Sequence, residues 1–378
     1  MKFIDEELIA DKKVILRCDY NVPCDNDVIT DNSRIVKSLI TINYLLQQNC
    51  SIIILSHMGR IKNKEDKLDN SLRLVAEELS RLINKKVDFV DDPVGMKVLN
   101  KCKNLKSGEV ILLENTRFCD VPEKLESKND LGLSEYWASL ADVFVVDAFG
   151  SLHRAHASVA GISRFLPTYL GLLVKEELVG LDPVTKNTAK PFGVFMGGGK
   201  VDDKIKYIKN ILPKCDYLFL GGGIANSFLL ASGYDIGNSL ATSDENLLNE
   251  LKWLLEEYKD KIVLPIDFVI DNNSIFDLGI KTINKYKKFL ERCKTIFING
   301  TCGKFEDEKY SNGTKTLFES LNNIDAYIAA GGGDTLSAIK QFGFSNTFDF
   351  LSSGGGASLE YISANKLEAL SFIEENNS

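Results

Sequence analysis

The chain has 378 residues, of which 44% are hydrophobic and 26% charged, and its formal net charge is −8. This length favours two domains over one, each large enough to bury a core. The negative charge argues against general binding to nucleic acid or anionic membranes, although a local basic pocket could still bind an acidic metabolite. Neither a signal peptide nor an apolar run of about 18 residues is found, so we expect a cytoplasmic protein without a membrane partner.

Cysteine and histidine content gives little support to metal or disulfide chemistry. The eight cysteines form no Cys-x-x-Cys pair and several lie in apolar runs, so we expect them to be reduced. Only three histidines are present, and His153 and His156 have neither the spacing nor the neighbouring cysteines of a four-ligand zinc shell. The Gly-x-Ser-x-Gly motif of serine hydrolases is also absent from the sequence, which disfavours a catalytic triad.

Short apolar runs alternate with longer amphipathic segments along the chain, which is typical of stacked βαβ units. Both halves are therefore predicted to form parallel sheets. The first half holds predicted strands at 14–16, 51–55, 110–113 and 143–146, and the second at 193–196, 217–220, 262–264, 295–298, 326–329 and 347–350. Between the halves, residues 168–183 keep apolar positions at helical spacing and end at a proline, which predicts one helix joining two lobes.

Arginine is concentrated in the first half, where eight of the nine arginines of the chain lie at or before residue 164. Guanidinium groups match phosphate and carboxylate with a planar fork that lysine cannot reproduce. Any one of these arginines could be an ordinary surface ion-pair partner. Four of them, Arg17, Arg60, Arg117 and Arg154, lie at the ends of four predicted strands and together predict a site for a small polyanion. The segments that carry these four arginines and all three histidines are 17–21, 56–60, 114–118 and 147–156.

Four Gly-Gly-Gly triplets in the second half each follow an apolar run and precede a predicted helix. Glycine lets the backbone approach a phosphate closely, and a helix N-terminus offers free N–H groups. One triplet alone is more often a tight turn, but four at the ends of parallel strands predict a nucleotide site. None of them completes a dinucleotide-binding, P-loop or protein-kinase signature. The triplets lie at 197–199, 221–223, 331–333 and 354–356.

Residues near the triplets could supply the groups that phosphoryl transfer requires. Lys200 and Lys204 stand four apart at the start of a predicted helix, so we expect them to share a face and to reach phosphate oxygens. Asp334 follows a triplet and could hold Mg²⁺ that bridges nucleotide phosphates. The alternatives are that Lys204 is a solvated helix residue and Asp334 a helix N-cap.

Motifs spread over nearly the whole chain resemble those of the phosphoglycerate kinase family. The first half contains Arg-Cys-Asp-Tyr-Asn-Val-Pro, Ser-His-Met-Gly-Arg and Asp-Ala-Phe-Gly-Ser-Leu-His-Arg-Ala-His, and the second contains Gly-Gly-Gly-Asp-Thr and Gly-Gly-Gly-Ala-Ser-Leu-Glu. The matching segments are 17–23, 56–60, 112–118, 147–156, 197–204, 221–225, 264–267, 299–306, 331–335 and 354–360.

The resemblance implies an α/β fold of two Rossmann-like, three-layer αβα lobes joined by a helical hinge. It places a phosphoglycerate lobe at 1–165, a hinge at 166–185 and a nucleotide lobe at 186–360, with a tail from about 361 to 378 packing back on the first lobe. It implies reversible transfer between MgATP and the carboxylate of 3-phosphoglycerate, giving MgADP and 1,3-bisphosphoglycerate, a step of glycolysis and gluconeogenesis. A monomer is the family-level expectation.

The resemblance also assigns roles to individual residues. The residues that would clamp phosphoglycerate are Asp19, Asn21, Arg34, His57, Arg60, Arg117 and Arg154, and Arg34 would also lie near the transferring group. Lys200 would steady the migrating phosphoryl group, Lys204 the nucleotide phosphates, and Asp334 the Mg²⁺ ion. The remaining nucleotide contacts would be Gly222, Asn299, Glu306, Gly332, Gly333 and Thr335.

The acceptor carboxylate is already ionised at neutral pH, so no general base is expected. Two anions must instead be brought together, and the rate should come from charge neutralisation by Arg34, Lys200 and Mg²⁺ in a water-poor cleft that closes about the connecting helix.

Departures from the family pattern bear on the adenine site and on docking of the tail. They are Gly199, Ile280, Ile298, Thr301, Cys302, Ser353 and the loss of a Leu-Pro-Gly motif near the C-terminus. Two alternatives therefore stay open. One is an acyl-phosphate kinase for a different acid, and the other is a weakened descendant that binds nucleotide or partners without turnover.

Overall fold

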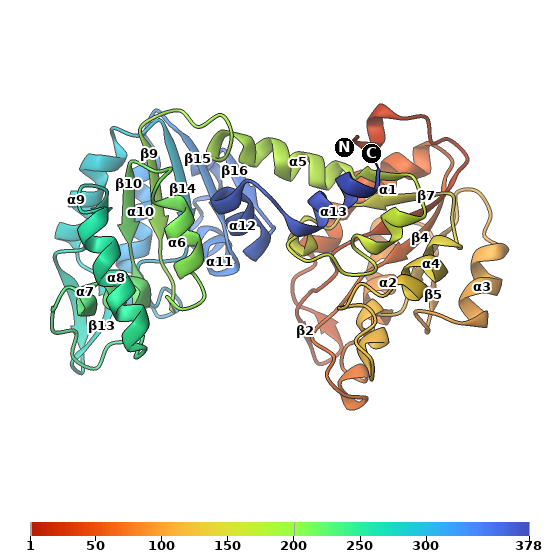
Figure 1. Ribbon diagram of the computed structural model, residues 1–378, viewed down its shortest axis with the longest axis horizontal. Helices are drawn as coiled ribbons and strands as arrows, with labels where there is room; N and C mark the ends of the chain where they lie inside the picture. Colours follow the sequence, from red (N-terminus) through yellow and green to blue (C-terminus); the bar gives the residue numbers. More distant parts are fainter. Residues whose placement is uncertain (1, 200, 378) are drawn as a thin grey trace. The chain divides into compact units, whose positions relative to one another are not determined.

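The computed structural model describes residues 2–199 and 201–377 and divides into two compact units. Unit 1 holds the chain up to Leu178 together with the segment from Lys366 onward, and unit 2 holds Val179–Asn365. Each unit contains one six-stranded parallel sheet with helices on its faces (Figure 1). The predicted fold class of two αβα lobes is therefore confirmed. The unit boundary falls within helix α5, Leu172–Leu181.

The sheet of unit 1 has the order β5-β6-β4-β1-β7-β8, with every neighbouring pair parallel. Its strands are β1 Lys13–Arg17, β4 Ser51–Leu55, β5 Val87–Val90, β6 Val110–Leu113, β7 Val143–Val146 and β8 Thr168–Leu170. Strand β1 is central, and its Ile15 lies opposite Ile53 on one side and Phe144 on the other. A small hairpin of β2 Cys24–Asp25 and β3 Val28–Ile29 follows β1.

The helices of unit 1 cover both faces of this sheet, which explains why β4, β6 and β7 are buried along their whole length. Val14 and Leu16 pack with Leu45 of α1 and Leu79 of α2 in one continuous core. The helices are α1 Ser33–Gln47, α2 Arg73–Leu82, α3 Met96–Lys103, α4 Leu131–Ala138 and α13 Glu368–Asn376.

Unit 2 also contains a six-stranded parallel sheet, but with a different strand order. Its sheet has the order β11-β10-β9-β14-β15-β16, again with every neighbouring pair parallel. Its strands are β9 Phe192–Met196, β10 Tyr217–Leu220, β11 Ile262–Val263, β14 Thr295–Asn299, β15 Tyr327–Gly331 and β16 Phe350–Ser352. An aromatic core that includes Phe219, Tyr286 and Phe318 fills one side of the sheet.

The remaining elements of unit 2 are seven helices and an antiparallel hairpin among the described residues. The hairpin is β12 Phe268–Asp271 with β13 Ser274–Leu278. The helices are α6 Ile205–Ile211, α7 Gly222–Ala231, α8 Glu245–Glu257, α9 Ile280–Leu290, α10 Asn312–Leu321, α11 Gly333–Phe342 and α12 Gly356–Ala364.

Two predictions about helices are wrong. The predicted helix 168–183 begins with strand β8, which pairs with β7, and the helix starts only at Leu172. The expectation that Lys200 and Lys204 share a helix face also fails, because α6 starts at Ile205 and Lys204 is its N-cap. Lys200 itself lies outside the described residues. Strand β5 escaped prediction because Asp88 interrupts its apolar run, and β8 because residues 168–170 were included in the predicted helix.

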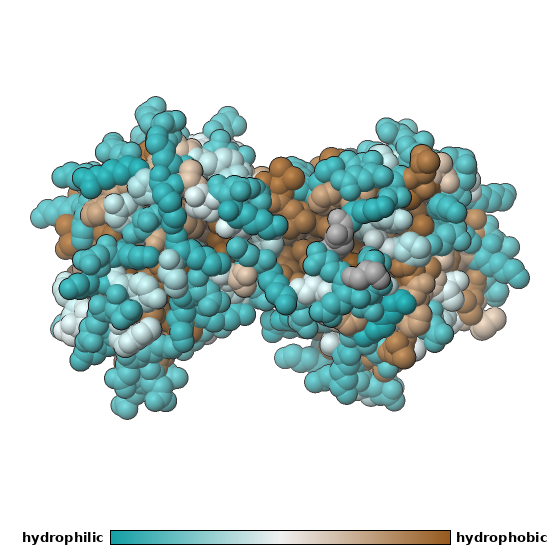
Figure 2. Space-filling view, turned by 45° about the horizontal axis from the view of Figure 1, so that its top comes forward, coloured by the Kyte–Doolittle hydropathy of each residue, from teal (hydrophilic) through white to brown (hydrophobic). Residues whose placement is uncertain are grey.

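The surface drawn in Figure 2 is mainly hydrophilic, with smaller apolar areas. No helix among the described residues is long and apolar enough to cross a membrane. All eight cysteines are free thiols; six are buried, Cys119 is half-buried and Cys24, in β2, is exposed.

Candidate active site

Adjacent strands bring the arginine-rich segments of unit 1 to one edge of its sheet. Strands β6, β4, β1 and β7 are consecutive neighbours, and each is followed directly by one of these segments. The chain leaves β1 toward β4 and later returns on its other side to β7, which makes the end of β1 a topological switch point. Ligands of open α/β sheets bind outside the carboxyl ends of the strands at such a point.

Asp19 and Arg34 form an ion pair at this edge. Arg34 lies in the first turn of α1, and its Nη1 is 2.6 Å from Oδ2 of Asp19. Burial acts against the Asp19 carboxylate, but the charges of Arg34 and Arg17 and a hydrogen bond from the Asn21 N–H hold the pKa of Asp19 below its usual value. Asp19 is therefore an anion, and its pairing holds the guanidinium of Arg34 beside the end of β1.

Asn21 and Arg117 meet on the backbone of Gly59. The Gly59 N–H donates to Oδ1 of Asn21 at 2.9 Å, and Nη1 of Arg117 donates to the Gly59 carbonyl. The Arg117 N–H donates to Oδ1 of Asn115 at 3.1 Å. Loops after β1, β4 and β6 are thus tied together, and the sequence-predicted residues they carry lie in one cluster.

His57 is buried within this cluster and receives a hydrogen bond from Arg17, with 3.0 Å between Nη2 and Nδ1. Burial lowers the pKa of His57 well below its usual value, and the cations Arg17, Arg117 and Arg34 act in the same direction. Burial and the same arginine-rich surroundings lower the pKa of His156 to about 3.

The last two predicted acid-binding residues are exposed at the same edge. Arg60 follows Gly59 directly, and Arg154 is close enough to Arg117 to lower the pKa of its guanidinium, although burial is the larger cause. The edge of unit 1 therefore carries more cationic than anionic side chains although the whole chain is negatively charged.

In unit 2 the loops after β9, β14 and β15 are joined by side-chain hydrogen bonds. Nδ2 of Asn299 donates to the Gly331 carbonyl at 2.7 Å, and the Thr335 hydroxyl accepts from the Gly300 N–H at 2.7 Å. Gly332 has φ of +107°, and a Cβ there would lie 2.7 Å from Nδ2 of Asn299. Only glycine fits this turn. Without a side chain at Gly332, the backbone N–H groups at the N-terminus of α11, beside Gly333 and Asp334, stay accessible to a ligand.

Lys204 spans the same loops. Its Nζ donates to the Gly197 carbonyl at 2.8 Å and to Oδ1 of Asn299 at 2.6 Å. Burial lowers the pKa of Lys204 to about 8, and Asp334 opposes this shift. Lys204, Asn299, Gly332, Gly333, Asp334 and Thr335 all line a cavity of about 360 Å³.

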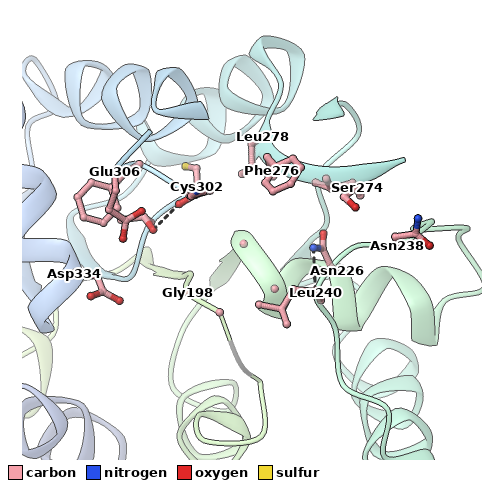
Figure 3. A pocket seen from close by; sticks show the side chains of 18 residues that line it. Gly198, Asn226, Asn238, Leu240, Ser274, Phe276, Leu278, Cys302, Glu306 and Asp334 are labelled. Carbon is pink, nitrogen blue, oxygen red and sulfur yellow. Dashed lines mark hydrogen bonds between the residues drawn. The ribbon is translucent and has the colours of Figure 1, made fainter. Parts of the chain in front are cut away.

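A second cavity of about 500 Å³ adjoins the first and shares Asp334 with it (Figure 3). Gly222 and Glu306, two of the nucleotide contacts that the resemblance implies, line this cavity. Gly222 has φ of +56°, and a Cβ there would lie 2.8 Å from the Gly198 carbonyl oxygen. Three of the four glycine triplets run directly into a helix, whereas α6 starts six residues after Gly199.

Several lining residues of the larger cavity were missed by the sequence analysis. Leu240, Phe276 and Leu278 give it an apolar wall, and Asn226, Asn238 and Ser274 add polar groups. Phe276 and Leu278 belong to the unpredicted hairpin strand β13, so no sequence signal placed them there. Among the departures from the family pattern, Gly199, Thr301 and Cys302 line the cavity. Ile298 is instead buried in β14, and Ile280 is exposed at the start of α9.

Comparison with known proteins gives one consistent result. The family model described as phosphoglycerate kinase matches residues 4–365. The chain belongs to the phosphoglycerate kinase family. It is 41% identical to the phosphoglycerate kinase of Enterococcus faecalis and 42% identical to that of Listeria welshimeri, with 99% of both chains covered in each case.

Solved structures of phosphoglycerate kinases agree in fold over the whole chain. The enzyme from Coxiella burnetii superposes with a TM-score of 0.86 at 34% identity, covering 99% of each chain. The enzyme from Pyrococcus horikoshii also gives 0.86, at 27% identity, covering 100% of this chain and 99% of the other. The family predicted from the motifs is therefore confirmed.

Proposed function

We propose that this chain catalyses the phosphoglycerate kinase reaction, in which a phosphoryl group moves reversibly between MgATP and the carboxylate of 3-phosphoglycerate. The proposal rests mainly on one observation, that a single chain of this family contains two different candidate sites. Unit 1 offers an arginine-rich edge for an acidic metabolite, and unit 2 offers two adjoining glycine-lined cavities for a nucleotide.

In unit 1, the phosphoglycerate ligands would be Asp19, Asn21, Arg34, His57, Arg60, Arg117 and Arg154. Fixed guanidinium groups suit both ends of this substrate, because phosphate and carboxylate each accept two parallel N–H bonds. The Asp19 carboxylate would keep Arg34 oriented while the substrate is absent.

In unit 2, the apolar wall beside Phe276 suits a nucleotide base, and Glu306, which lines the same cavity, would accept hydrogen bonds from ribose hydroxyls. The phosphates would lie in the smaller cavity, where the N-terminus of α11 and Lys204 provide positive charge. Lys200 would act on the migrating phosphoryl group.

Asp334 fits a Mg²⁺ ion that arrives with the nucleotide. The described residues contain no group of three or more acidic, histidine or cysteine side chains that could hold a metal alone. Mg²⁺ commonly binds through one or two carboxylates plus substrate phosphates, and Asp334 is an exposed carboxylate on both cavities. The ion would supply charge neutralisation between the nucleotide and the acceptor.

Catalysis would rest on positioning and electrostatics, since the acceptor carboxylate has no proton to remove. Arg34 and Lys200 would neutralise charge that develops as the two anions approach. We also propose that the enzyme is a cytoplasmic monomer.

A coupled assay of ATP consumption tests the proposal. We expect Mg²⁺-dependent turnover with 3-phosphoglycerate that exceeds turnover with other small carboxylic acids by orders of magnitude. A preference for another acid would favour a different acyl-phosphate kinase. Tight MgADP binding without turnover on any acid would favour a weakened descendant, and either result would contradict the proposal.

A further inference from the structure

Arg17 and Glu126 are buried charged side chains to which the proposed function gives no role. Arg17 ends β1 and is 1% exposed, and Glu126 lies in the loop before α4 and is fully buried. Burying charges is costly unless they are hydrogen-bonded and compensated. Their hydrogen bonds should therefore explain what the two residues do.

The network starts at Glu126, which only accepts. Oε2 accepts the Ser158 N–H at 2.9 Å, and Oε1 accepts the hydroxyls of Ser158 and Thr116, the latter at 3.3 Å. The single hydroxyl proton of Ser158 is thus directed at Glu126. Its oxygen is left to accept from Nε of Arg17 at 2.9 Å. Glu126 compensates the Arg17 charge through Ser158 and fixes the orientation of the guanidinium.

The other side of the guanidinium fixes His57. Nη1 of Arg17 donates to the Cys18 carbonyl, and Nη2 lies 3.0 Å from Nδ1 of His57. A guanidinium has five donors and no acceptor, so Nδ1 must be the acceptor and carries no proton. In a neutral imidazole the proton is then on Nε2, which is the only ring nitrogen left to meet a ligand.

We infer that Arg17 is a positioning residue that holds His57 as a neutral imidazole with its proton on Nε2, so that phosphoglycerate meets an N–H donor there rather than a cation. The inference rests on the proposed function of unit 1. A second proton could bind only at Nδ1, where it would break the bond from Arg17.

The charged surroundings of His57 support this state. Arg17, Arg34 and Arg117 oppose a positive imidazole, whereas Asp19 favours it. Asp19 is already paired with Arg34. His57 should consequently add no charge to the acid-binding edge of unit 1 at neutral pH.

Nitrogen NMR of the side chains of the intact chain tests the inference directly. The chain has three histidines, so three imidazole signals are expected, and His57→Gln assigns one of them by its loss. We expect Nδ1 of His57 to resonate as an unprotonated nitrogen and Nε2 as a protonated one, without change between about pH 5.5 and 8, although an ordinary histidine titrates near 6.5. A proton on Nδ1, or a midpoint near 6.5, would overturn the inference.

Kinetics of two His57 variants give an independent readout. Glutamine keeps a neutral N–H donor, whereas leucine of similar size has none. We expect the KM for 3-phosphoglycerate to be about tenfold higher in His57→Leu than in His57→Gln, as for the loss of one hydrogen bond in a buried site. An equal rise in both variants would contradict the donor role.

The role of Arg17 is tested in the double variant Arg17→Gln, Glu126→Gln, which removes both buried charges together. We expect the His57 ring of this variant to take up a second proton at a higher pH than in the unmodified protein, because the bond to Nδ1 and one repelling cation are lost. The midpoint should stay below about 6.5, since burial, Arg34 and Arg117 still disfavour the charged ring. An unchanged His57 titration by nitrogen NMR in a folded variant would refute the positioning role, and if the variant does not fold, the NMR result for the unmodified protein still decides.

These results separate the inference from the proposed function. Absence of turnover with 3-phosphoglycerate would refute the proposed function and, with it, the role of the Nε2 donor. An active enzyme whose His57 carries its proton on Nδ1 would refute this inference alone.

Discussion

At the scale of single residues, the acid-binding edge of unit 1 is organised by pairs rather than by isolated cations. Asp19 holds Arg34, Gly59 joins Asn21 to Arg117, and Arg17 holds His57. Each pairing orients a long side chain before any ligand arrives, which lowers the entropy lost on binding.

Arg34→Ala should reduce kcat strongly with folding intact. Removal of one preorganised group that stabilises transition-state charge commonly costs about 10²–10³-fold in kcat, and we expect a loss of this order. Steady-state kinetics with circular dichroism would measure both properties. Arg292→Ala, which removes an exposed arginine at the end of α9, serves as the control and should stay within about twofold. Turnover of Arg34→Ala close to that of the control would refute the role of Arg34.

Motifs in the sequence identified these candidate residues, but they did not predict the contacts between them. Arg34 and Glu306 were identified only through the family resemblance, since neither directly ends a predicted strand. Glu126 gave no signal, because a buried carboxylate in a loop looks like any acidic loop residue until its partners are known. The role assigned to Lys200 stays a prediction, as do the roles of the other site residues.

At the scale of elements, the turn from β15 to α11 shapes the phosphate end of the nucleotide site. Gly332 combines a positive φ with close approach to Asn299, so the turn tolerates no side chain without moving a residue that also holds Lys204.

Gly332→Ala should therefore weaken nucleotide binding, with an expected rise of at least about tenfold in the Kd for MgADP, or 1.4 kcal/mol. The other end of α11 offers a matched control. Gly343 also has a positive φ, +77°, but a Cβ there would meet nothing within 4 Å. Gly343→Ala places a side chain in the left-handed α region, at a cost of about 1–2 kcal/mol in stability, and should leave the Kd nearly unchanged. Calorimetric titration of both variants with MgADP provides the measurement, and equal affinities would refute the argument.

Asp147 links β7 to the start of α5 and should make stability depend on pH. Its Oδ1 accepts the N–H groups of Leu173 and Val174, at 3.0 and 3.2 Å, and burial raises its pKa from 3.8 to about 6. Between these pH values the folded protein binds more protons than the unfolded chain. Stability should consequently fall as pH rises from about 4 to 6, by about 3 kcal/mol for this group.

Asp147→Asn keeps the Oδ1 acceptor and cannot ionise, so it should remove this fall in stability and be at least as stable as the unmodified protein at pH 7. Urea unfolding can be followed through Trp137, which is fully buried in unit 1, in a Trp253→Phe background. The exposed Asp260→Asn is the control and should keep the original pH profile. If the stability of Asp147→Asn also falls between about pH 4 and 6, Asp147 is not the cause of the fall.

At the scale of the whole molecule, two six-stranded parallel sheets with different strand orders carry different kinds of site. The alternation of apolar and amphipathic segments was enough to predict two parallel sheets, because strands buried on both faces read as continuous apolar runs. Short strands such as β5 and β8, and the hairpin that supplies Phe276, depend on tertiary packing that no local pattern records. The domain limits taken from the resemblance, 1–165, 166–185 and 186–360 with a returning tail, remain predictions.

The chain has a net charge of −8, but its acid-binding edge is rich in arginine. Binding of 3-phosphoglycerate to this edge should therefore depend strongly on salt concentration. Raising ionic strength from about 0.01 M to 0.15 M shortens the screening length from about 30 Å to 8 Å. We expect the KM for 3-phosphoglycerate to rise severalfold over this range, and less in Arg154→Gln. Lys86→Gln, before β5 and so at the opposite end of the strands, should behave like the unmodified protein. Identical salt profiles in all three proteins would argue against long-range attraction by this edge.

The distribution of the cysteines has a practical consequence. Because Cys24 is the one exposed thiol and six others are buried, a bulky maleimide dye should attach once per chain under native conditions, on the hairpin that follows β1. The natural sequence thus provides a labelling position beside the acid-binding edge, and ligand-induced changes there can be followed by fluorescence without engineering a new attachment point.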